Sequence, residues 1–223
     1  MQKKSFIFGA STLGRLLFFY LNQEGTPPEA FVVDDAYYNC SQFCGISVIP
    51  YSQARNLFRP ECCAAYVAIG YMNMNAVRQE ACQRLLAAGY YLPNYIHPSV
   101  MNYSAEMGYG NLLFPGVILD AYTQLGSGNI LYPSAMISHN SKIGSYNFFA
   151  PRAALAGDIT VGDRNFFGLN CSVKNGVKIG DCCLIGASAY ANRDMESGDA
   201  LAAPHSTKLK EKSTEQIQKV MKR

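Results

Sequence analysis

The chain has 223 residues, of which 49% are hydrophobic and 16% are charged, and its formal net charge is +3. This composition is typical of a folded globular protein and excludes a disordered one, and the small net charge gives no reason to expect a nucleic-acid partner. The length leaves room for one or two domains.

The eight cysteines include no Cys-x-x-Cys pair, and only three histidines are present. A zinc cluster is therefore disfavoured against reduced, structural thiols, which predict a cytoplasmic location. The apolar run from Phe6 to Leu21 imitates a signal peptide, but Arg15 interrupts it and no small-residue cleavage site follows. No segment is long and apolar enough to predict a membrane span.

A strand, a glycine turn and a helix are predicted at the start of the chain. The apolar run 5–8 predicts a buried strand, and residues 9–14 (GASTLG) predict a turn that opens an amphipathic helix. The turn resembles the dinucleotide fingerprint G-x-G-x-x-G, with Ser11 in place of the middle glycine. Gly9 permits the tight turn, Gly14 lets the helix approach the strand, and the helix N-terminus presents N–H groups to an anion. The missing middle glycine argues against NAD.

A second apolar run, 30–33, predicts another buried strand, and two acids follow it, Asp34 and Asp35. They lie about twenty residues beyond the glycine turn, where an acid can hold a ribose hydroxyl or a base edge. The alternative is a solvated strand end. Because the acids and the glycine turn occur together, we favour a binding role.

The remainder of the first ninety-five residues predicts a mixed loop with a short helix at 52–57, a third strand at 64–69 that ends at Gly70, and a helix over 73–88. Arg78 falls on an early turn of that helix and could reach a phosphate at the strand ends, although an exposed helix arginine is the ordinary alternative. Alternating strands and helices predict a parallel sheet with its site at the carboxyl ends of the strands.

A six-residue repeat then runs from about residue 101 to 190. An aliphatic residue, Met or Phe recurs at every sixth position: Met101, Met107, Leu113, Leu119, Leu125, Leu131, Ile137, Ile143, Phe149, Leu155, Val161, Phe167, Val173, Ile179 and Ile185. Hexapeptide repeats of this kind predict a parallel β-helix, with three repeats in each coil and these anchors pointing inward. A β-sandwich would instead need alternating strands at wider spacing. Cys171 and Cys183 fall at small inward positions, where a thiol packs as a small hydrophobe.

His139 is the one histidine within the repeats, just beyond an inward position and so on or near the outer surface. A zinc site of the γ-type carbonic anhydrase kind needs three histidine ligands and is disfavoured. Gly157 lies one coil beyond His139, and the segments 168–170 and 186–188 follow, in positions that favour a long thin ligand along the coils. The alternative is that these are only corner residues. A basic segment, 206–223, ends the chain with a predicted short helix.

These motifs together resemble the hexapeptide-repeat acyltransferases of the sialic acid O-acetyltransferase type, and within them the nucleotide-aminosugar N-acetyltransferases. The matching segments include FIFGASTLG, VVDD, VAIG, YIHPS, SHNSKIG, LAGDITVGDRNFFG, VKIGDCCLIGA and APHSTK. The resemblance implies a Rossmann-like nucleotide-sugar-binding domain at 1–95, a left-handed parallel β-helix that holds acetyl-CoA at 96–205, and a basic tail at 206–223. It implies transfer of acetyl from acetyl-CoA to a nucleotide-linked amino deoxysugar, in the synthesis of a bacterial surface glycan such as the O-antigen of lipopolysaccharide. It also implies a homotrimer with acetyl-CoA between neighbouring β-helices, and no metal.

The resemblance also implies roles for single residues. His139 is the expected base, and a backbone N–H at Gly157 is expected to stabilise the oxyanion. The residues expected to bind the nucleotide sugar are Gly9, Ser11, Thr12, Leu13, Asp34, Asp35, Gly70, Asn73 and Arg78. Those expected to contact acetyl-CoA are Phe148, Gly157, Leu169, Ala187 and Lys208.

The sequence departs from the family pattern at two positions. Relatives often carry an acid after the catalytic histidine, where this chain has Asn140, and many carry a second histidine where it has Phe148. We therefore expect a weaker base, or one oriented by a carboxylate from elsewhere in the chain. A sugar O-acetyltransferase and a non-catalytic nucleotide-sugar-binding protein stay open as alternatives.

Overall fold

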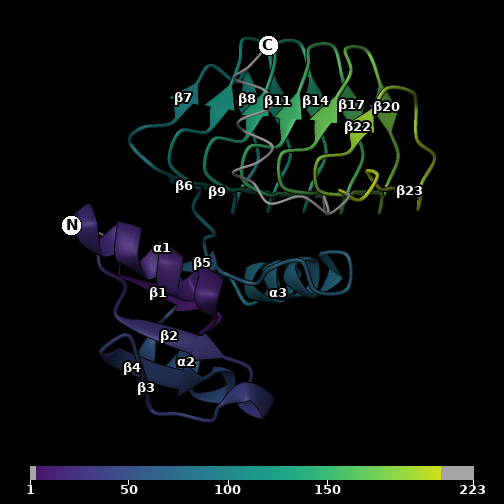
Figure 1. Ribbon diagram of the computed structural model, residues 1–223. Helices are drawn as coiled ribbons and strands as arrows, with labels where there is room; N and C mark the ends of the chain where they lie inside the picture. The colour runs from purple at the N-terminus through teal and green to yellow at the C-terminus, as the bar shows by residue number, and fades with distance from the viewer. Residues whose placement is uncertain (1–3, 207–223) are drawn as a thin grey trace, which may run out of the picture.

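The computed structural model describes residues 4–206 and has two parts, a small α/β sheet and a long parallel β-helix (Figure 1). The sheet and its helices lie on one side of the β-helix, beside β6 and β9. Within the described residues, no helix has the length and apolar character needed to cross a membrane.

The sheet has the strand order β3-β4-β2-β1-β5. Its parallel strands are β1 (Lys4–Phe8), β2 (Ala30–Val33), β4 (Ile46–Pro50) and β5 (Cys63–Val67), and β3 (Gln42–Phe43) pairs antiparallel with β4 at the edge. The helices are α1 (Thr12–Gln23), α2 (Tyr51–Leu57) and α3 (Ala76–Ala87), with a 3-10 helix, η1 (Asp35–Tyr37). The sequence predicted these three helices and the strands β1, β2 and β5, but not the hairpin β3–β4, which lies in the segment predicted as mixed loop.

The two faces of this sheet have different neighbours because alternate side chains of a strand point to opposite sides. Phe6 and Phe8 of β1 pack in one cluster with residues of α2 and α3. Ile7 packs in another cluster with α1 and with β-helix residues such as Leu112 and Phe148. The β-helix therefore covers one face of the sheet beside α1, and the two parts share a core.

The β-helix has three faces, each a parallel sheet of two-residue strands. Face 1 consists of β7 (Met101–Asn102), β10 (Ile118–Leu119), β13 (Met136–Ile137), β16 (Ala154–Leu155), β19 (Ser172–Val173) and β22 (Tyr190–Ala191). Face 2 consists of β8 (Glu106–Met107), β11 (Gln124–Leu125), β14 (Lys142–Ile143), β17 (Thr160–Val161) and β20 (Lys178–Ile179). Face 3 consists of β6 (Tyr95–Ile96), β9 (Leu112–Leu113), β12 (Ile130–Leu131), β15 (Phe148–Phe149), β18 (Phe166–Phe167), β21 (Leu184–Ile185) and β23 (Ala200–Leu201). We call the turn between faces 1 and 2 corner 1, that between faces 2 and 3 corner 2, and that between faces 3 and 1 corner 3.

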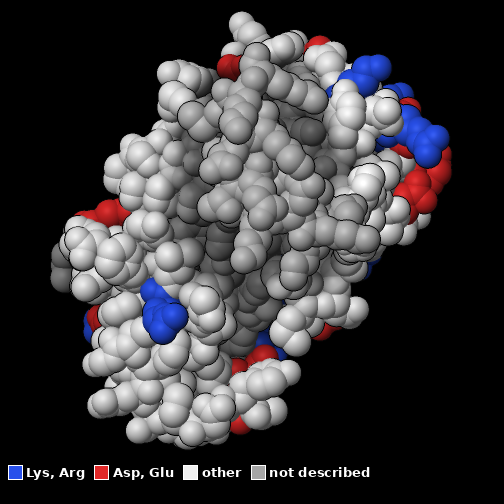
Figure 2. Space-filling model, viewed as in Figure 1, with Lys and Arg blue, Asp and Glu red and all other residues white. Residues whose placement is uncertain are grey.

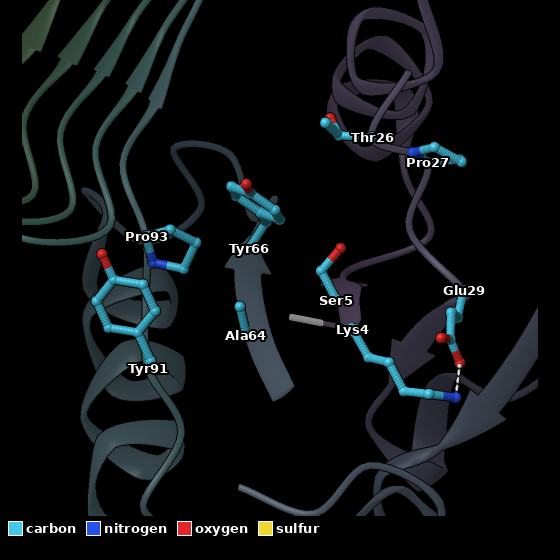
Figure 3. Close-up of a pocket in the computed structure, with 9 residues that line it drawn as sticks. All are labelled: Lys4, Ser5, Thr26, Pro27, Glu29, Ala64, Tyr66, Tyr91 and Pro93. Atoms are coloured by element: carbon cyan, nitrogen blue, oxygen red, sulfur yellow. Dashed lines mark hydrogen bonds and ion pairs between the residues drawn. The ribbon is translucent and has the colours of Figure 1, made fainter. Parts of the chain in front are cut away.

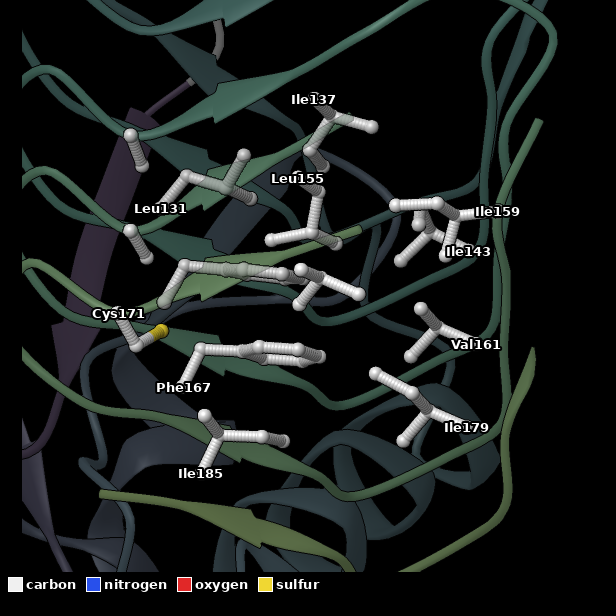
Figure 4. Packing of buried hydrophobic residues seen from close by; sticks show 14 of the residues in the cluster. Leu131, Ile137, Ile143, Leu155, Ile159, Val161, Phe167, Cys171, Ile179 and Ile185 are labelled. Atoms are coloured by element: carbon white, nitrogen blue, oxygen red, sulfur yellow. The ribbon is translucent and has the colours of Figure 1, made fainter. Parts of the chain in front are cut away.

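The predicted anchors form the core of the β-helix. From Leu113 to Ile185 they are buried in one continuous cluster, and Figure 4 shows part of this cluster, between Leu131 and Ile185, stacked along the coils. The rings of Phe149 and Phe167 stack with centroids 4.5 Å apart. Cys171 and Cys183 are buried free thiols, as the sequence predicted, and burial raises the pKa of Cys171 to about 12. The predicted fold class, a Rossmann-like domain followed by a left-handed β-helix, is confirmed.

The first anchor was predicted wrongly. Met101 is 48% exposed and pairs with the outward residue Ile118, while Asn102 pairs with the anchor Leu119. The turn between β7 and β8 has one residue fewer than the turn between β10 and β11. This missing residue shifts the first coil out of the six-residue register.

The outer sides of the three faces differ in character. Face 3 presents apolar side chains that the α/β part covers, including Leu112 and Ile130. Face 2 presents Gln124, Lys142 and Thr160 to solvent. Face 1 presents mostly apolar side chains that stay partly exposed: Met101, Ile118, Met136, Ala154, Ser172 and Tyr190. Partly exposed apolar patches of this kind mark interaction surfaces.

Candidate functional site

The glycine turn has the geometry that the sequence predicted. Gly9 adopts φ +118°, a conformation that side chains rarely allow. A Cβ on Gly14 would collide with the carbonyl oxygen of Gly9, so only glycine allows this approach of α1 to β1. Ser11 is the N-cap of α1: its hydroxyl accepts a hydrogen bond from the Gly14 N–H and donates one to the Ala68 carbonyl, each at 3.2 Å.

A cavity opens at the carboxyl ends of β1, β2 and β5. Four residues of the predicted binding set line it together, Gly9, Ser11, Asp34 and Gly70. This is the edge of a parallel sheet at which ligands bind in such folds. The sequence prediction missed the other lining residues, among them Tyr37, Met72 and Val77.

The two predicted acids have different neighbours. Asp34 lines the cavity and forms an ion pair with Arg84 of α3, whose guanidinium lies 4.6 Å from the centroid of the Tyr51 ring. Asp35 points elsewhere and accepts a hydrogen bond from the Ser52 N–H at 3.1 Å, which caps the start of α2. Asp34 is therefore placed to meet a ligand in the cavity, and Asp35 has a local capping role.

Three other predicted binding residues do not line this cavity. Thr12 is exposed on the first turn of α1, whereas the side chain of Leu13 is buried in the core. Asn73 is exposed and begins a turn in which Asn73, Met74 and Asn75 all have positive φ. Asn tolerates this left-handed region and Met does not, so the turn before α3 stores backbone strain beside the cavity.

Arg78 does not face the cavity, and its predicted contact with a phosphate is wrong. It is fully buried between α3 and the β-helix. Its guanidinium donates to the carbonyl oxygens of Gly70 (2.7 Å), Gly128 (2.9 Å) and Tyr146 (2.7 Å), among others. Burial lowers the pKa of Arg78 to about 10, so the group stays charged at neutral pH. Its N–H groups therefore link the two parts of the chain, because Gly70 belongs to the α/β part whereas Gly128 and Tyr146 belong to the β-helix.

A second cavity lies at the opposite, amino-terminal end of the same strands (Figure 3). Lys4, Glu29, Ala64 and Tyr66 line it, and Lys4 pairs with Glu29 at 3.0 Å. It contains none of the predicted binding residues. Because ligands of parallel sheets bind outside the carboxyl ends of the strands, the cavity at the glycine turn is the better candidate for a ligand site.

His139 lies exposed at corner 1, between β13 and β14. Its ring lies directly over Gly157 of the next coil: a Cβ built on Gly157 would come within 2.5 Å of the ring carbon Cε1 and 2.6 Å of Nε2. The backbone joins the two coils at the same place, where the Asp158 N–H donates to the His139 carbonyl at 3.0 Å. Gly157 thus forms the floor on which the imidazole rests.

We expect Gly157→Ala to lower the turnover of the acetyl transfer that the sequence predicts by at least about tenfold. The added methyl group must push the imidazole away, and small displacements of a catalytic group reduce the rate strongly. Gly157 does not need a left-handed backbone, and the His139 side chain is exposed, so the melting temperature should change little. Steady-state kinetics and a thermal melt of the same preparation check both expectations. Gly176→Ala adds a methyl group that meets no neighbour, so it should leave turnover unchanged, although its φ of +75° makes some loss of stability expected there. Unchanged turnover would show that the ring position over Gly157 is unimportant.

The next residue, Asn140, connects His139 to a carboxylate. The Asn140 amide nitrogen lies 3.2 Å from His139 Nδ1 and 3.2 Å from an Asp158 carboxylate oxygen. Asp158 was not among the predicted site residues. The sequence spacing could have identified it, because Asp158 follows Asn140 by eighteen residues, one full coil, and residues one coil apart lie side by side.

The residues predicted to contact acetyl-CoA do not lie in one line. Gly157 is at corner 1, whereas Leu169 and Ala187 are exposed at corner 3, on the other side of face 1. Phe148 is 5% exposed and packs between Tyr132, Phe166 and Tyr71 in the interface with the α/β part, so its predicted contact is wrong. Lys208 lies outside the described residues.

A shallow cavity at corner 3 includes Ala187, Ser188 and a residue that the prediction missed, His205. Seen from the side of Figure 2, most of the described surface is uncharged, and charged side chains gather over the carboxy-terminal coils of the β-helix. Two surfaces of the β-helix thus carry candidate residues, corner 1 with His139 and corner 3 with Leu169 and Ala187. They border face 1 from its two sides.

No protein-family model matches the sequence, and no curated protein matches it either. Solved structures do match it over nearly the whole chain. A mutant of perosamine N-acetyltransferase from Caulobacter crescentus, in complex with CoA and GDP-perosamine, has a TM-score of 0.81 and 25% sequence identity, and the match covers 92% of this chain and 99% of that one. The acetyltransferase domain of PglB from Neisseria gonorrhoeae FA1090, solved in complex with acetyl coenzyme A, has a TM-score of 0.81 and 24% identity, with 91% and 97% covered. WeeI from Acinetobacter baumannii AYE has a TM-score of 0.81 and 21% identity, with the same coverage.

These matches confirm the resemblance predicted from the sequence. The chain is a structural relative of hexapeptide-repeat acetyltransferases, among them one that acts on a nucleotide-linked amino sugar. The similarity extends over both parts of the chain and not only over the repeats.

Proposed function

We propose that this protein transfers the acetyl group of acetyl-CoA to the amine of a nucleotide-linked deoxysugar. The observation that carries the proposal is the pairing of two sites in one chain: a glycine-turn cavity with Asp34 at the carboxyl ends of the sheet, and an exposed histidine over a glycine at corner 1. A fold match of over 90% of the chain to an N-acetyltransferase complexed with CoA and a GDP-sugar supports it.

The chemistry needs no group beyond those of the two substrates and the chain. The amine lone pair attacks the thioester carbonyl carbon, and the carbonyl oxygen becomes negative. The C–S bond then breaks, the CoA thiolate leaves, and the proton lost by the amine ends on that sulfur, so that an amide and free CoA result. The enzyme gains rate by stabilising the oxyanion and by handling the proton. His139 is our candidate for the residue that acts on the reacting atoms, because at neutral pH an imidazole can either donate a hydrogen bond to the oxyanion or accept a proton from the amine.

The acetyl-CoA groove requires more than one copy of the chain. Corners 1 and 3 lie on opposite sides of face 1, so Gly157 and Leu169 of one copy cannot line one groove together. If face 1 packs around a three-fold axis, corner 1 of each copy meets corner 3 of the next. The partly exposed apolar side chains of face 1, such as Met101 and Tyr190, support this packing. We therefore propose a homotrimer with acetyl-CoA between copies.

The nucleotide part of the substrate belongs, in this proposal, at the glycine turn. The N–H groups at the start of α1 suit a phosphate, and Asp34 suits a hydroxyl or a base edge. A cytoplasmic location and a role in making a bacterial surface glycan follow as proposals from the substrate class, since nucleotide sugars are the donors of glycan assembly.

The test is release of free CoA thiol from acetyl-CoA in the presence of UDP-, dTDP- and GDP-linked 3-amino and 4-amino deoxysugars, with the matching hydroxy sugars in parallel. Turnover with one amino sugar, and none with its hydroxy counterpart, is the expected result. Turnover with hydroxy sugars alone would establish O-acetylation. Binding of a nucleotide sugar with no thiol release under any condition would favour the non-catalytic alternative.

A change at Asp34 should separate binding from turnover. We expect Asp34→Ala to raise the KM for the nucleotide sugar about tenfold or more, because a hydrogen bond to a charged group contributes about 1.5–3 kcal/mol, and to leave kcat nearly unchanged. The KM for acetyl-CoA should stay the same. Glu61→Gln, which removes an exposed charge far from the cavity, is the control. An unchanged KM for every nucleotide sugar would remove Asp34 from the site.

A further inference from the structure

The polarity of the contacts around Asn140 determines which nitrogen of His139 carries its hydrogen. An amide nitrogen only donates, and a carboxylate oxygen only accepts. The Asn140 nitrogen, at 3.2 Å from both partners, therefore gives one hydrogen to Asp158 and the other to Nδ1 of His139. A neutral imidazole has one donor and one acceptor nitrogen. Since Nδ1 accepts, the hydrogen lies on Nε2.

Asp158 is what keeps the amide in this orientation. If the Asn140 amide turned by 180°, its oxygen would face the Asp158 carboxylate, and two acceptors in contact repel each other. The corner geometry holds both residues in place, because Asn140 and Asp158 each have φ +57° and lie one coil apart. Asn and Asp are the side chains that tolerate this region best.

The nitrogen that carries the hydrogen is the one at the floor of the site. A Cβ built on Gly157 would lie 2.6 Å from Nε2 and 3.0 Å from Nδ1, so Nε2 is the ring nitrogen nearer to this glycine, whose backbone N–H is expected to stabilise an oxyanion. A donor at Nε2 would add a second hydrogen bond at the same place. A base, in contrast, would need a lone pair there.

We propose that Asp158, acting through Asn140, is a positioning residue that fixes the hydrogen of His139 on Nε2, so that His139 donates to the thioester oxygen instead of accepting the amine proton. The amine proton then reaches the departing CoA sulfur without passing through the ring. The catalytic part of this inference rests on the proposed acetyl transfer, whereas the position of the hydrogen does not.

The sharpest test exchanges the two side chains, Asn140→Asp with Asp158→Asn. The double variant keeps the net charge, nearly the same atoms and two residues suited to positive φ. Its hydrogen-bond polarity is reversed: the new amide at 158 donates to the new carboxylate at 140, which then accepts from Nδ1–H and leaves a lone pair on Nε2. The exchange thus converts His139 from a donor to a base without emptying the site.

The first readout is the ¹⁵N spectrum of histidine-labelled protein in the pH range where the ring is neutral, with His139→Gln to identify the His139 signals. We expect hydrogen on Nε2 in the wild type and on Nδ1 in the exchanged protein. Hydrogen on Nδ1 in the wild type overturns the proposal, and this result does not depend on any activity. If the exchanged protein does not fold, Asp158→Asn alone should give a measurable Nδ1–H population, and an unchanged spectrum would count against Asp158.

The second readout is kcat with the active amino sugar. The exchanged protein should lose at least about tenfold, because one oxyanion donor typically contributes 10²–10³ in kcat and the Gly157 N–H is retained. An equal or higher kcat would show that His139 works as a base and would overturn the donor role. If the wild type itself releases no thiol with any sugar, the proposed function fails, while the spectrum still decides where the hydrogen lies.

Discussion

His139→Ala is expected to lower kcat by at least about a hundredfold, which is the usual scale both for losing an oxyanion donor and for losing a general acid or base. The KM values for acetyl-CoA and for the nucleotide sugar should change little, because the proposed role of the ring is to act on the reacting atoms and not to hold either substrate. The melting temperature should also stay close to that of the wild type, since His139 is exposed.

This expectation is checked by measuring kcat and KM of the purified His139→Ala variant, with Lys142→Ala as the control. Lys142 is an exposed residue of the same coil, on face 2, and its change should leave turnover unaffected. Turnover of His139→Ala within a few-fold of the wild type would remove His139 from the reacting centre, and with it the donor role inferred from Asn140 and Asp158.

The largest loss of stability is expected for Arg78→Met. The variant leaves the buried carbonyl oxygens of Gly70, Gly128 and Tyr146 without the donors that the guanidinium supplies. Each acceptor left without its donor inside the protein costs about 1–3 kcal/mol, so the loss of all of them should cost about 3 kcal/mol or more. For a chain of this size the melting temperature should fall by about 6 °C or more.

A thermal melt or denaturant titration of Arg78→Met checks this loss, with Arg15→Met as the matched control, because Arg15 is exposed on α1. Arg78→Lys should recover only part of the stability, since a lysine has three donors on one atom and cannot span these carbonyls. A melting temperature of Arg78→Met equal to that of Arg15→Met would contradict the role of Arg78 as the link between the two parts.

The β-helix could be predicted from the sequence because its repeat requires an apolar residue at every sixth position. Burial of each anchor is a local requirement, so the pattern survives wherever the coil has regular corners, from Leu113 to Ile185. It failed at Met101, where one turn is a residue shorter. The glycine turn could be predicted for a similar reason, because Gly9 and Gly14 are required by the local backbone.

The role of Arg78 could not be predicted from its residue type, because its partners are backbone carbonyls far away in the sequence. The helix pattern did contain a signal: Arg78 lies on the same stripe of α3 as the buried residues Ala81, Cys82 and Leu85. The separation of Leu169 from Gly157 was also missed. Twelve residues separate them, which is two repeats and not a full coil of eighteen, so they belong to different corners.

The measurement that tests the central claim most directly is the mass and linkage of the sugar product, followed together with thiol release, for the nucleotide-linked amino sugar that gives turnover. The account predicts one acetyl group on the sugar nitrogen for each CoA released, and at least about a hundredfold less of both with His139→Ala. Thiol release with no acetylated sugar, or an acetyl group on a hydroxyl oxygen, would contradict N-acetyl transfer at this site.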